Sequence, residues 1–200
     1  MPVTLRIPVI ADAQPIQRIY ASYVTDTVIS FEEIPPTVPE MENRLRQSLP
    51  IYPWVVAEMD QTLVGYAYAG QHRRRAAYRW TVETSIYLDS NYLGKGIGHQ
   101  LYRALLQILK SQGFLSVYAG IALPNPPSIG LHERVGFKYL GVFSQVGFKF
   151  NRWVDVGWWE LKLEDPTSLK LPLATKPFTE IPDLDEILKD QFSQQFSGNG

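Results

Sequence analysis

Cysteine is absent from the 200 residues of the chain, which excludes disulfides, thiolate zinc sites and cysteine nucleophiles together. Only three histidines are present, so we expect no metal site. No apolar run approaches the roughly 18 residues of a membrane-spanning helix, and the N-terminus lacks the basic stretch and long apolar core of a signal peptide. The net charge of -1 leaves no basic excess for nucleic acid or an anionic membrane. These absences predict a cytoplasmic protein that binds neither.

The composition that remains is that of a globular domain with a full core, since 45% of the residues are hydrophobic and 20% are charged. Over residues 1–164 the apolar periodicity gives the order β-α-α-β-β-β-α-β-α-β-β, which predicts one mixed α/β domain. The composition changes near residue 165. We expect residues 165–200 to be a tail with one short helix near 182–192 and a disordered end.

Local signals set the boundaries of these elements. Asp12 is expected to cap the first helix, and Thr37 with Glu40 matches a capping box before the second. Gly113 stands where the third helix should end, and Ser128 is expected to cap the fourth. Six of the seven expected strands have predicted ranges, which are 3–7, 53–59, 63–70, 80–88, 114–123 and 157–163. The expected helices cover 15–24, 38–49, 98–113 and 129–135.

Three glycines at alternate positions, Gly94, Gly96 and Gly98, separate the strand over 80–88 from the helix over 98–113. Glycine costs roughly 1 kcal/mol relative to alanine inside a helix, so its repeated use at a helix start suits a loop that exposes backbone N–H groups. The first N–H groups of a helix have no internal partner and favour an anion. The loop is therefore a candidate anion site.

Several interpretations of this loop compete. A P-loop is excluded because Lys95 lies between glycines with no Ser or Thr after it, and a dinucleotide fingerprint is excluded by the G-x-G-x-G spacing deep in the chain. A glycine-rich turn without a ligand stays open. The sequence "LGKGIG" instead resembles the pyrophosphate loop of acyl-CoA N-acyltransferases, with Leu93 where arginine or glutamine is usual. Leu93 removes a side-chain contact but leaves the backbone donors.

Further segments extend this resemblance to the GNAT superfamily and to its phosphinothricin N-acetyltransferase branch. In chain order they are "WTVETSIYL", "GKGIGHQLY", "LPNPPSIGLHERVGF" and "GFKFNRWVDVGWW", and the resemblance covers about residues 3–163. It implies the GNAT fold, a central mixed sheet flanked by helices in which two splayed parallel strands hold acetyl-CoA. It also implies a homodimer.

The same resemblance implies cofactor-binding residues on three segments. In the strand over 80–88, backbone groups form hydrogen bonds with the pantetheine amides, which lie beside it like an added strand. The glycine loop holds the pyrophosphate. The side-chain amide of Asn125 contacts the cofactor, although an asparagine here is otherwise an ordinary turn residue, and Lys95 is as often merely solvated. The predicted set is Ile86, Tyr87, Leu88, Gly94, Lys95, Gly96, Ile97, Gly98, His99 and Asn125.

Acetyl transfer to an amine requires a group that removes the ammonium proton, because the ammonium form has no lone pair. Glu83 is the candidate general base, since it is an acid within an otherwise apolar strand just before the cofactor segment. The resemblance also implies a substrate-contacting glutamate at this position. The alternative is a structural glutamate paired with a neighbouring Arg or Tyr.

His132 is the second predicted catalytic residue. Many GNAT members have a tyrosine here that protonates the departing thiolate, whereas the phosphinothricin branch has histidine. The resemblance implies that His132 either donates to sulfur or only fixes the cofactor gap. A lone histidine on a short helix is more often structural.

The loop before the Glu83 strand is predicted to border the acceptor. Its three arginines would hold a phosphinate, sulfone-like or carboxylate group through bidentate hydrogen bonds, or they form a solvated charge run. The resemblance places an aromatic residue against the substrate at Phe31, for which core packing is the alternative. The predicted acceptor residues are Phe31, Arg73, Arg74, Arg75, Tyr78 and Glu83.

Together these residues predict an N-acetyltransferase that moves acetyl from acetyl-CoA to the α-amine of an amino-acid-like small molecule such as phosphinothricin, methionine sulfoximine or methionine sulfone. Direct attack in a ternary complex is expected, because no cysteine is present to carry the acetyl group. Two alternatives stay open: an acetyltransferase for a protein N-terminus, a lysine or a polyamine, and a non-catalytic acetyl-CoA-binding module.

Overall fold

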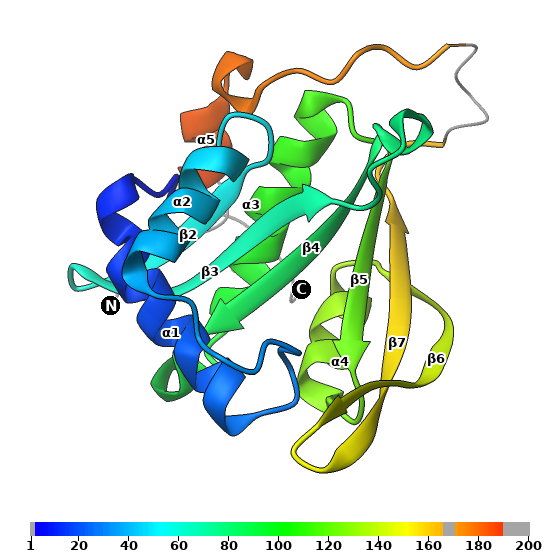
Figure 1. The fold of residues 1–200 in the computed structure, drawn as a ribbon. Helices are drawn as coiled ribbons and strands as arrows, with labels where there is room; N and C mark the ends of the chain where they lie inside the picture. Colours follow the sequence, from blue (N-terminus) through cyan, green and yellow to red (C-terminus); the bar gives the residue numbers. More distant parts are fainter. Residues whose placement is uncertain (1–2, 166–170, 190–200) are drawn as a thin grey trace, which may run out of the picture.

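Seven strands form one mixed sheet with helices on both of its faces (Figure 1). The computed structural model describes residues 3–165 and 171–189, and up to residue 164 its strands and α-helices follow the predicted order, which confirms the α/β class. The spatial order of the strands is β1-β2-β3-β4-β5-β7-β6. The strands are β1 Thr4–Arg6, β2 Trp54–Met59, β3 Thr62–Gln71, β4 Thr81–Leu88, β5 Ser116–Ala122, β6 Lys138–Lys149 and β7 Arg152–Lys162; the helices are α1 Ala13–Asp26, α2 Val38–Ser48, α3 Ile97–Gln112, α4 Pro126–Arg134 and α5 Leu184–Lys189.

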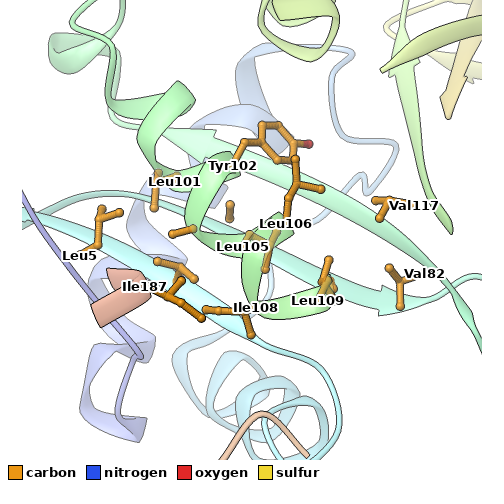
Figure 2. Packing of buried hydrophobic residues seen from close by; sticks show 14 of the residues in the cluster. Leu5, Val82, Leu101, Tyr102, Leu105, Leu106, Ile108, Leu109, Val117 and Ile187 are labelled. Carbon is orange, nitrogen blue, oxygen red and sulfur yellow. The ribbon is translucent and has the colours of Figure 1, made fainter. Parts of the chain in front are cut away.

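The two faces of the sheet are covered by different helices. Helices α1 and α2 pack on one face and α3 on the other, so β4 alternates between them: Val82 joins the core under α3, and Tyr87 joins the core under α1. The apolar stripe of α3 lies against its face of the sheet (Figure 2). Leu101, Leu105, Ile108 and Leu109 of this stripe are all fully buried.

Strands β4 and β5 pair as parallel neighbours for only part of their lengths. Their ladder joins Thr81–Glu83 to Ser116–Tyr118. Beyond Glu83, β4 stays paired with β3 through Leu88, while β5 stays paired with β7, so the two strands separate (Figure 1). The sheet therefore has a wedge-shaped gap, and Glu83 lies at its closed end.

Several predicted helix ends are confirmed. The side chain of Thr37 accepts a hydrogen bond from the Glu40 N–H, and the Glu40 carboxylate accepts from the Thr37 N–H at 2.7 Å. Gly113 ends α3 with φ of +91°, a left-handed conformation that favours glycine.

Two predicted side-chain caps are not formed, although Asp12 does occupy the N-cap position of α1. The Asp12 carboxylate does not cap α1, because it instead accepts from the Val9 N–H at 2.7 Å and from the Arg6 guanidinium at 2.7 and 2.8 Å. Ser128 lies inside α4, which starts at Pro126. The side chain of Asn125 caps this helix by accepting from the Ser128 N–H at 3.3 Å.

The segment after β7 returns along α3. The Lys176 N–H donates to the Gln112 carbonyl at 2.9 Å, and Phe178, Ile181, Ile187 and Leu188 join the core under α3. Helix α5 falls within the range expected for a short helix, and the predicted disordered end of the chain lies outside the described residues. Among the described helices, none is long and apolar enough to cross a membrane.

Candidate active site

The gap between β4 and β5 opens into a cleft of about 680 Å³, bounded by the start of α3 and by α4. Both elements follow the C-terminal ends of the two parallel strands, which is why they meet at this edge. The residues predicted to bind the cofactor that line the cleft are Ile86, Leu88, Gly94, Gly96, Gly98, His99 and Asn125.

The glycine loop has the backbone that its composition predicts. Gly94 and Gly96 have φ of +73° and +79°, conformations that L side chains rarely adopt. Gly96 is the N-cap of α3, so the N–H groups of the next residues have no carbonyl acceptor within the helix. The helix dipole adds partial positive charge at the same end, which favours an anion in the cleft.

Cationic side chains reinforce this end of the cleft. Burial lowers the pKa of His99, and the nearby Arg103 and Arg134 guanidinium groups lower it further. Arg134 itself lines the cleft. The cleft therefore combines apolar walls with a positively charged end.

Within the described residues, no three His, Cys, Asp or Glu side chains gather so that they could hold a metal ion.

The remaining predicted cofactor residues lie outside the wall of the cleft. The side chain of Ile97 is buried in the core, and Tyr87 faces the other side of the sheet, where its ring contacts Tyr20 and Tyr23. Lys95 is exposed, with its Nζ 4.6 Å from the centre of the Tyr92 ring. For Tyr87 and Ile97 only backbone groups are available to a ligand in the cleft.

Tyr23 ties α1 to the end of β4. Its hydroxyl donates to the Leu88 carbonyl at 2.7 Å and accepts from the Leu88 N–H at 3.3 Å. Tyr23 also lines the cleft. Leu88 would therefore pair with a bound ligand only after the Tyr23 hydroxyl moves away.

A second cavity of about 50 Å³ lies in the gap itself, lined by both separated strands and by His132 and Tyr102. His132 is 3% exposed, and its ring lies between two hydrogen-bond partners. Nδ1 contacts the Ser128 carbonyl at 2.7 Å, so Nδ1 carries the hydrogen and Nε2 accepts from the Tyr102 hydroxyl at 2.7 Å. Burial lowers the pKa of His132 and raises that of Tyr102, so both groups are neutral near pH 7.

Glu83 is paired with a histidine and not with Arg or Tyr. Oε1 of Glu83 lies 2.7 Å from Nδ1 of His72, the first residue after β3. The Glu83 side chain is 37% exposed and the His72 side chain 12% exposed. The carboxylate thus stays accessible to a substrate while one of its oxygens is held by a partly buried ring.

The predicted acceptor residues lie around two loops. Arg73, Arg74 and Arg75 are exposed in the loop between β3 and β4, and the Tyr78 ring of the same loop contacts His72 edge-on at 5.7 Å. Phe31, 42% exposed, packs with its ring over Gly147 of β6. The structure therefore brings Tyr78, but not Phe31, to the Glu83–His72 pair.

Buried Lys149 fixes the loop that carries Phe31. Its Nζ donates to the Val24 and Ser30 carbonyls, both at 2.7 Å. The end of β6 and the segment after α1 are therefore joined next to Phe31, although the two lie more than a hundred residues apart in the chain.

Sequence reasoning missed His72, Tyr23 and Tyr102. A signal for His72 was present in the sequence. His72 directly follows β3, and β3 pairs with the strand that carries Glu83, so the two residues are expected near the same edge of the sheet. For Tyr23 and Tyr102 the sequence indicates only that each lies in an amphipathic helix. Their hydroxyl partners lie 65 and 30 residues away in the chain, and local periodicity carries no information about them.

Comparisons with known proteins agree with this geometry. A family model described as the acetyltransferase (GNAT) domain matches residues 5–158. The phosphinothricin N-acetyltransferase of Streptomyces viridochromogenes is 37% identical over 90% of this chain and 97% of its own length. The L-methionine sulfoximine/L-methionine sulfone acetyltransferase of Pseudomonas aeruginosa is 37% identical over 84% and 98%.

A solved structure extends the agreement to the fold. The GNAT superfamily phosphinothricin acetyltransferase from Sinorhizobium meliloti, crystallised in complex with acetyl-CoA, is 39% identical and superposes with a TM-score of 0.84 over 90% of this chain and 98% of its own. The chain therefore belongs to the GNAT superfamily, in its phosphinothricin N-acetyltransferase-like branch, and is an acetyl-CoA-dependent N-acetyltransferase.

Proposed function

We propose that this enzyme acetylates the α-amine of amino-acid-like small molecules of the phosphinothricin, methionine sulfoximine and methionine sulfone type. The relatives named for these acceptors support the proposal, since they align over most of this chain. The observation that carries it is the position of Glu83, an accessible carboxylate at the closed end of the gap between the two parallel strands.

Acetyl-CoA would bind along the cleft. The N–H groups from Gly94 to His99 would hold its pyrophosphate, and Arg134 supports the same end by its charge. Its pantetheine would extend beside β4, where Ile86 and Tyr87 lie beyond the paired part of β5. Asn125 lines this path while its side-chain oxygen caps α4, so its amide nitrogen is the group available to the cofactor.

The reaction follows from these positions. Glu83 takes a proton from the acceptor ammonium, the amine nitrogen bonds to the thioester carbonyl carbon, and the C–S bond breaks as the carbonyl re-forms. The nitrogen gives up its second proton as the amide forms, the coenzyme A thiolate takes up one proton, and the proton held by Glu83 passes to solvent. The products are therefore the N-acetylated acceptor, coenzyme A with a free thiol, and one proton. Direct attack is proposed because the chain has no cysteine to carry the acetyl group.

His132 is proposed to act at the gap by fixing Tyr102 and not by donating its own proton. Both ring nitrogens are engaged, and Nε2 is an acceptor of the Tyr102 hydrogen. Tyr102 lines the cavity between the strands, and its hydroxyl donates to His132. Of the two roles that the family resemblance implies for His132, this arrangement favours fixing the cofactor gap over donating a proton to the cofactor sulfur.

The exposed arginines are proposed to bind the acidic end of the acceptor. Arg73, Arg74 and Arg75 follow His72 directly, and Tyr78 of the same loop touches the His72 ring, so the loop starts at the base. Guanidinium groups match carboxylate and phosphinate oxygens in bidentate pairs. Phe31 is proposed as an apolar contact for the acceptor.

An acceptor panel tests this function. Release of free thiol from acetyl-CoA is measured with phosphinothricin, methionine sulfoximine, methionine sulfone, an N-terminal peptide and a polyamine. We expect the highest kcat/KM with the first three. Higher values with the peptide or the polyamine would reassign the acceptor, and tight acetyl-CoA binding without release from any amine would indicate a binding module.

We further propose a homodimer formed through β6 and β7. β6 is at the edge of the sheet, and the two strands expose large apolar side chains that a monomer would leave in water. Trp153, 61% exposed, contacts Phe148 with ring centroids 5.2 Å apart. Other members of this exposed surface are Tyr139, Leu140, Val142, Phe143, Val146 and Phe150.

The double substitution Phe148→Glu with Trp153→Glu should separate this dimer, because a buried unpaired carboxylate is costly. Light scattering is expected to give twice the 22.8 kDa chain mass for the wild type and the single mass for the variant. Ile51→Glu introduces one carboxylate at an exposed apolar residue outside β6 and β7, and should leave the mass unchanged. A wild-type protein at the single mass would contradict the proposal.

A further inference from the structure

The residue that holds the candidate base is His72, which the family resemblance did not single out. β3 and β4 run antiparallel, with Gly70 opposite Glu83 and Gln71 opposite Val82, so the chain leaves β3 beside the paired part of β4 and β5. His72 turns back over the sheet from this point, and its Nδ1 reaches Oε1 of Glu83 at 2.7 Å.

The His72 ring is fixed by packing on both of its sides. It stacks on Tyr118 with ring centroids 4.8 Å apart and planes inclined by 18°, and the Tyr78 ring meets it edge-on at 5.7 Å. Tyr118 is the β5 residue paired with Glu83, at the last step before the two strands separate. The imidazole therefore stacks on the residue that lies directly opposite Glu83 in the β4–β5 ladder.

The hydrogen bond has a defined direction when the carboxylate is ionised. A carboxylate is only an acceptor, so Nδ1 of His72 must carry the hydrogen and donate it to Oε1. Among the described residues this is the one hydrogen bond recorded for the His72 ring. Oε2 of Glu83 is left without this constraint, on a side chain that is still 37% exposed.

From this geometry we propose that His72 is a positioning residue for Glu83. Its Nδ1–H holds Oε1, so that Oε2 is presented to the ammonium group of the acceptor. The inference rests on the proposed function, because it assumes that Glu83 is the base. A carboxylate on three rotatable bonds otherwise samples many orientations, and a misplacement of about 1 Å can cost roughly 100-fold in rate.

Two substitutions separate the hydrogen bond from the packing. His72→Phe keeps an aromatic ring on Tyr118 but removes the donor, and we expect kcat to fall about 10- to 100-fold with the KM for acetyl-CoA unchanged. His72→Asn places a side-chain N–H at about the distance of Nδ1 from the backbone, and we expect it to restore kcat to within about threefold of the wild type. Equal loss in both variants, or wild-type kcat in His72→Phe, would overturn the inference.

A double-mutant cycle tests whether His72 acts through Glu83. If it does, His72→Phe has no further effect on kcat in a Glu83→Gln background, whereas a structural role would lower kcat in both backgrounds. The cycle also separates the two proposals. If Glu83→Gln alone keeps wild-type turnover, the proposed base is wrong; if Glu83→Gln is impaired and His72→Phe is not, only the positioning role fails.

Discussion

Replacing Glu83 by glutamine is expected to lower kcat at least ~100-fold, which is the usual contribution of a general base. The substitution keeps the size of the side chain and an oxygen that accepts from His72 Nδ1. It removes the basic group that takes the ammonium proton. Because Glu83 lines neither the 680 Å³ cleft nor the cavity in the gap, calorimetry should show unchanged acetyl-CoA affinity.

The matched control for this experiment is Glu164→Gln. Glu164 is a half-exposed carboxylate paired with Lys110 at 2.9 Å, and its neutralisation should leave both turnover and cofactor affinity at wild-type values. Thiol release by Glu83→Gln at a near-native rate, with the acceptor saturating, would remove Glu83 from the mechanism. Loss of acetyl-CoA binding in the same variant would instead show that the carboxylate supports the cleft.

The fold could be predicted from the sequence because its elements carry local signals. The apolar stripe of α3, the alternation of β4 and the Thr37–Glu40 capping box each depend on residues a few positions apart. Neither of the two predicted side-chain caps is formed. Asp12 occupies the N-cap position of α1, but its carboxylate is paired with Arg6 of β1. Ser128 follows the two prolines that start α4, so it lies inside the helix.

The parts of the candidate site that lie within contiguous segments of the sequence could be predicted. The glycine loop and the end of β4 supply part of the lining of the cleft, and both follow from the resemblance of contiguous segments. The groups that hold the reactive side chains come from elsewhere: His72 for Glu83, Tyr102 for His132 and Tyr23 for Leu88. Each of these contacts depends on how far the strands and helices are offset, which only the folded chain defines.

Replacing Gly98 by valine is expected to weaken acetyl-CoA binding about 100-fold, while kcat at saturating cofactor changes much less. A Cβ at this position would lie 3.1 Å from Leu131 Cδ2 and 3.5 Å from Ile86 Cδ1, so the added side chain fills the cleft between α3 and α4. The nearest atom is the end of a flexible leucine, which can move, so the fold should be kept. The expected loss equals one or two charge-assisted hydrogen bonds to the pyrophosphate, each about 1.5–3 kcal/mol.

Gly141→Val makes the same change on β6, where an added Cβ meets no atom within 4 Å, and should leave the affinity of the cleft at its wild-type value. The two valine variants are compared by calorimetric titration with acetyl-CoA and with free coenzyme A. Equal weakening for both ligands in Gly98→Val assigns the loss to the part they share, which includes the pyrophosphate. Weakening confined to acetyl-CoA would move the contact to the acetyl end, and unchanged affinity for both would mean that the cofactor does not pass between α3 and α4.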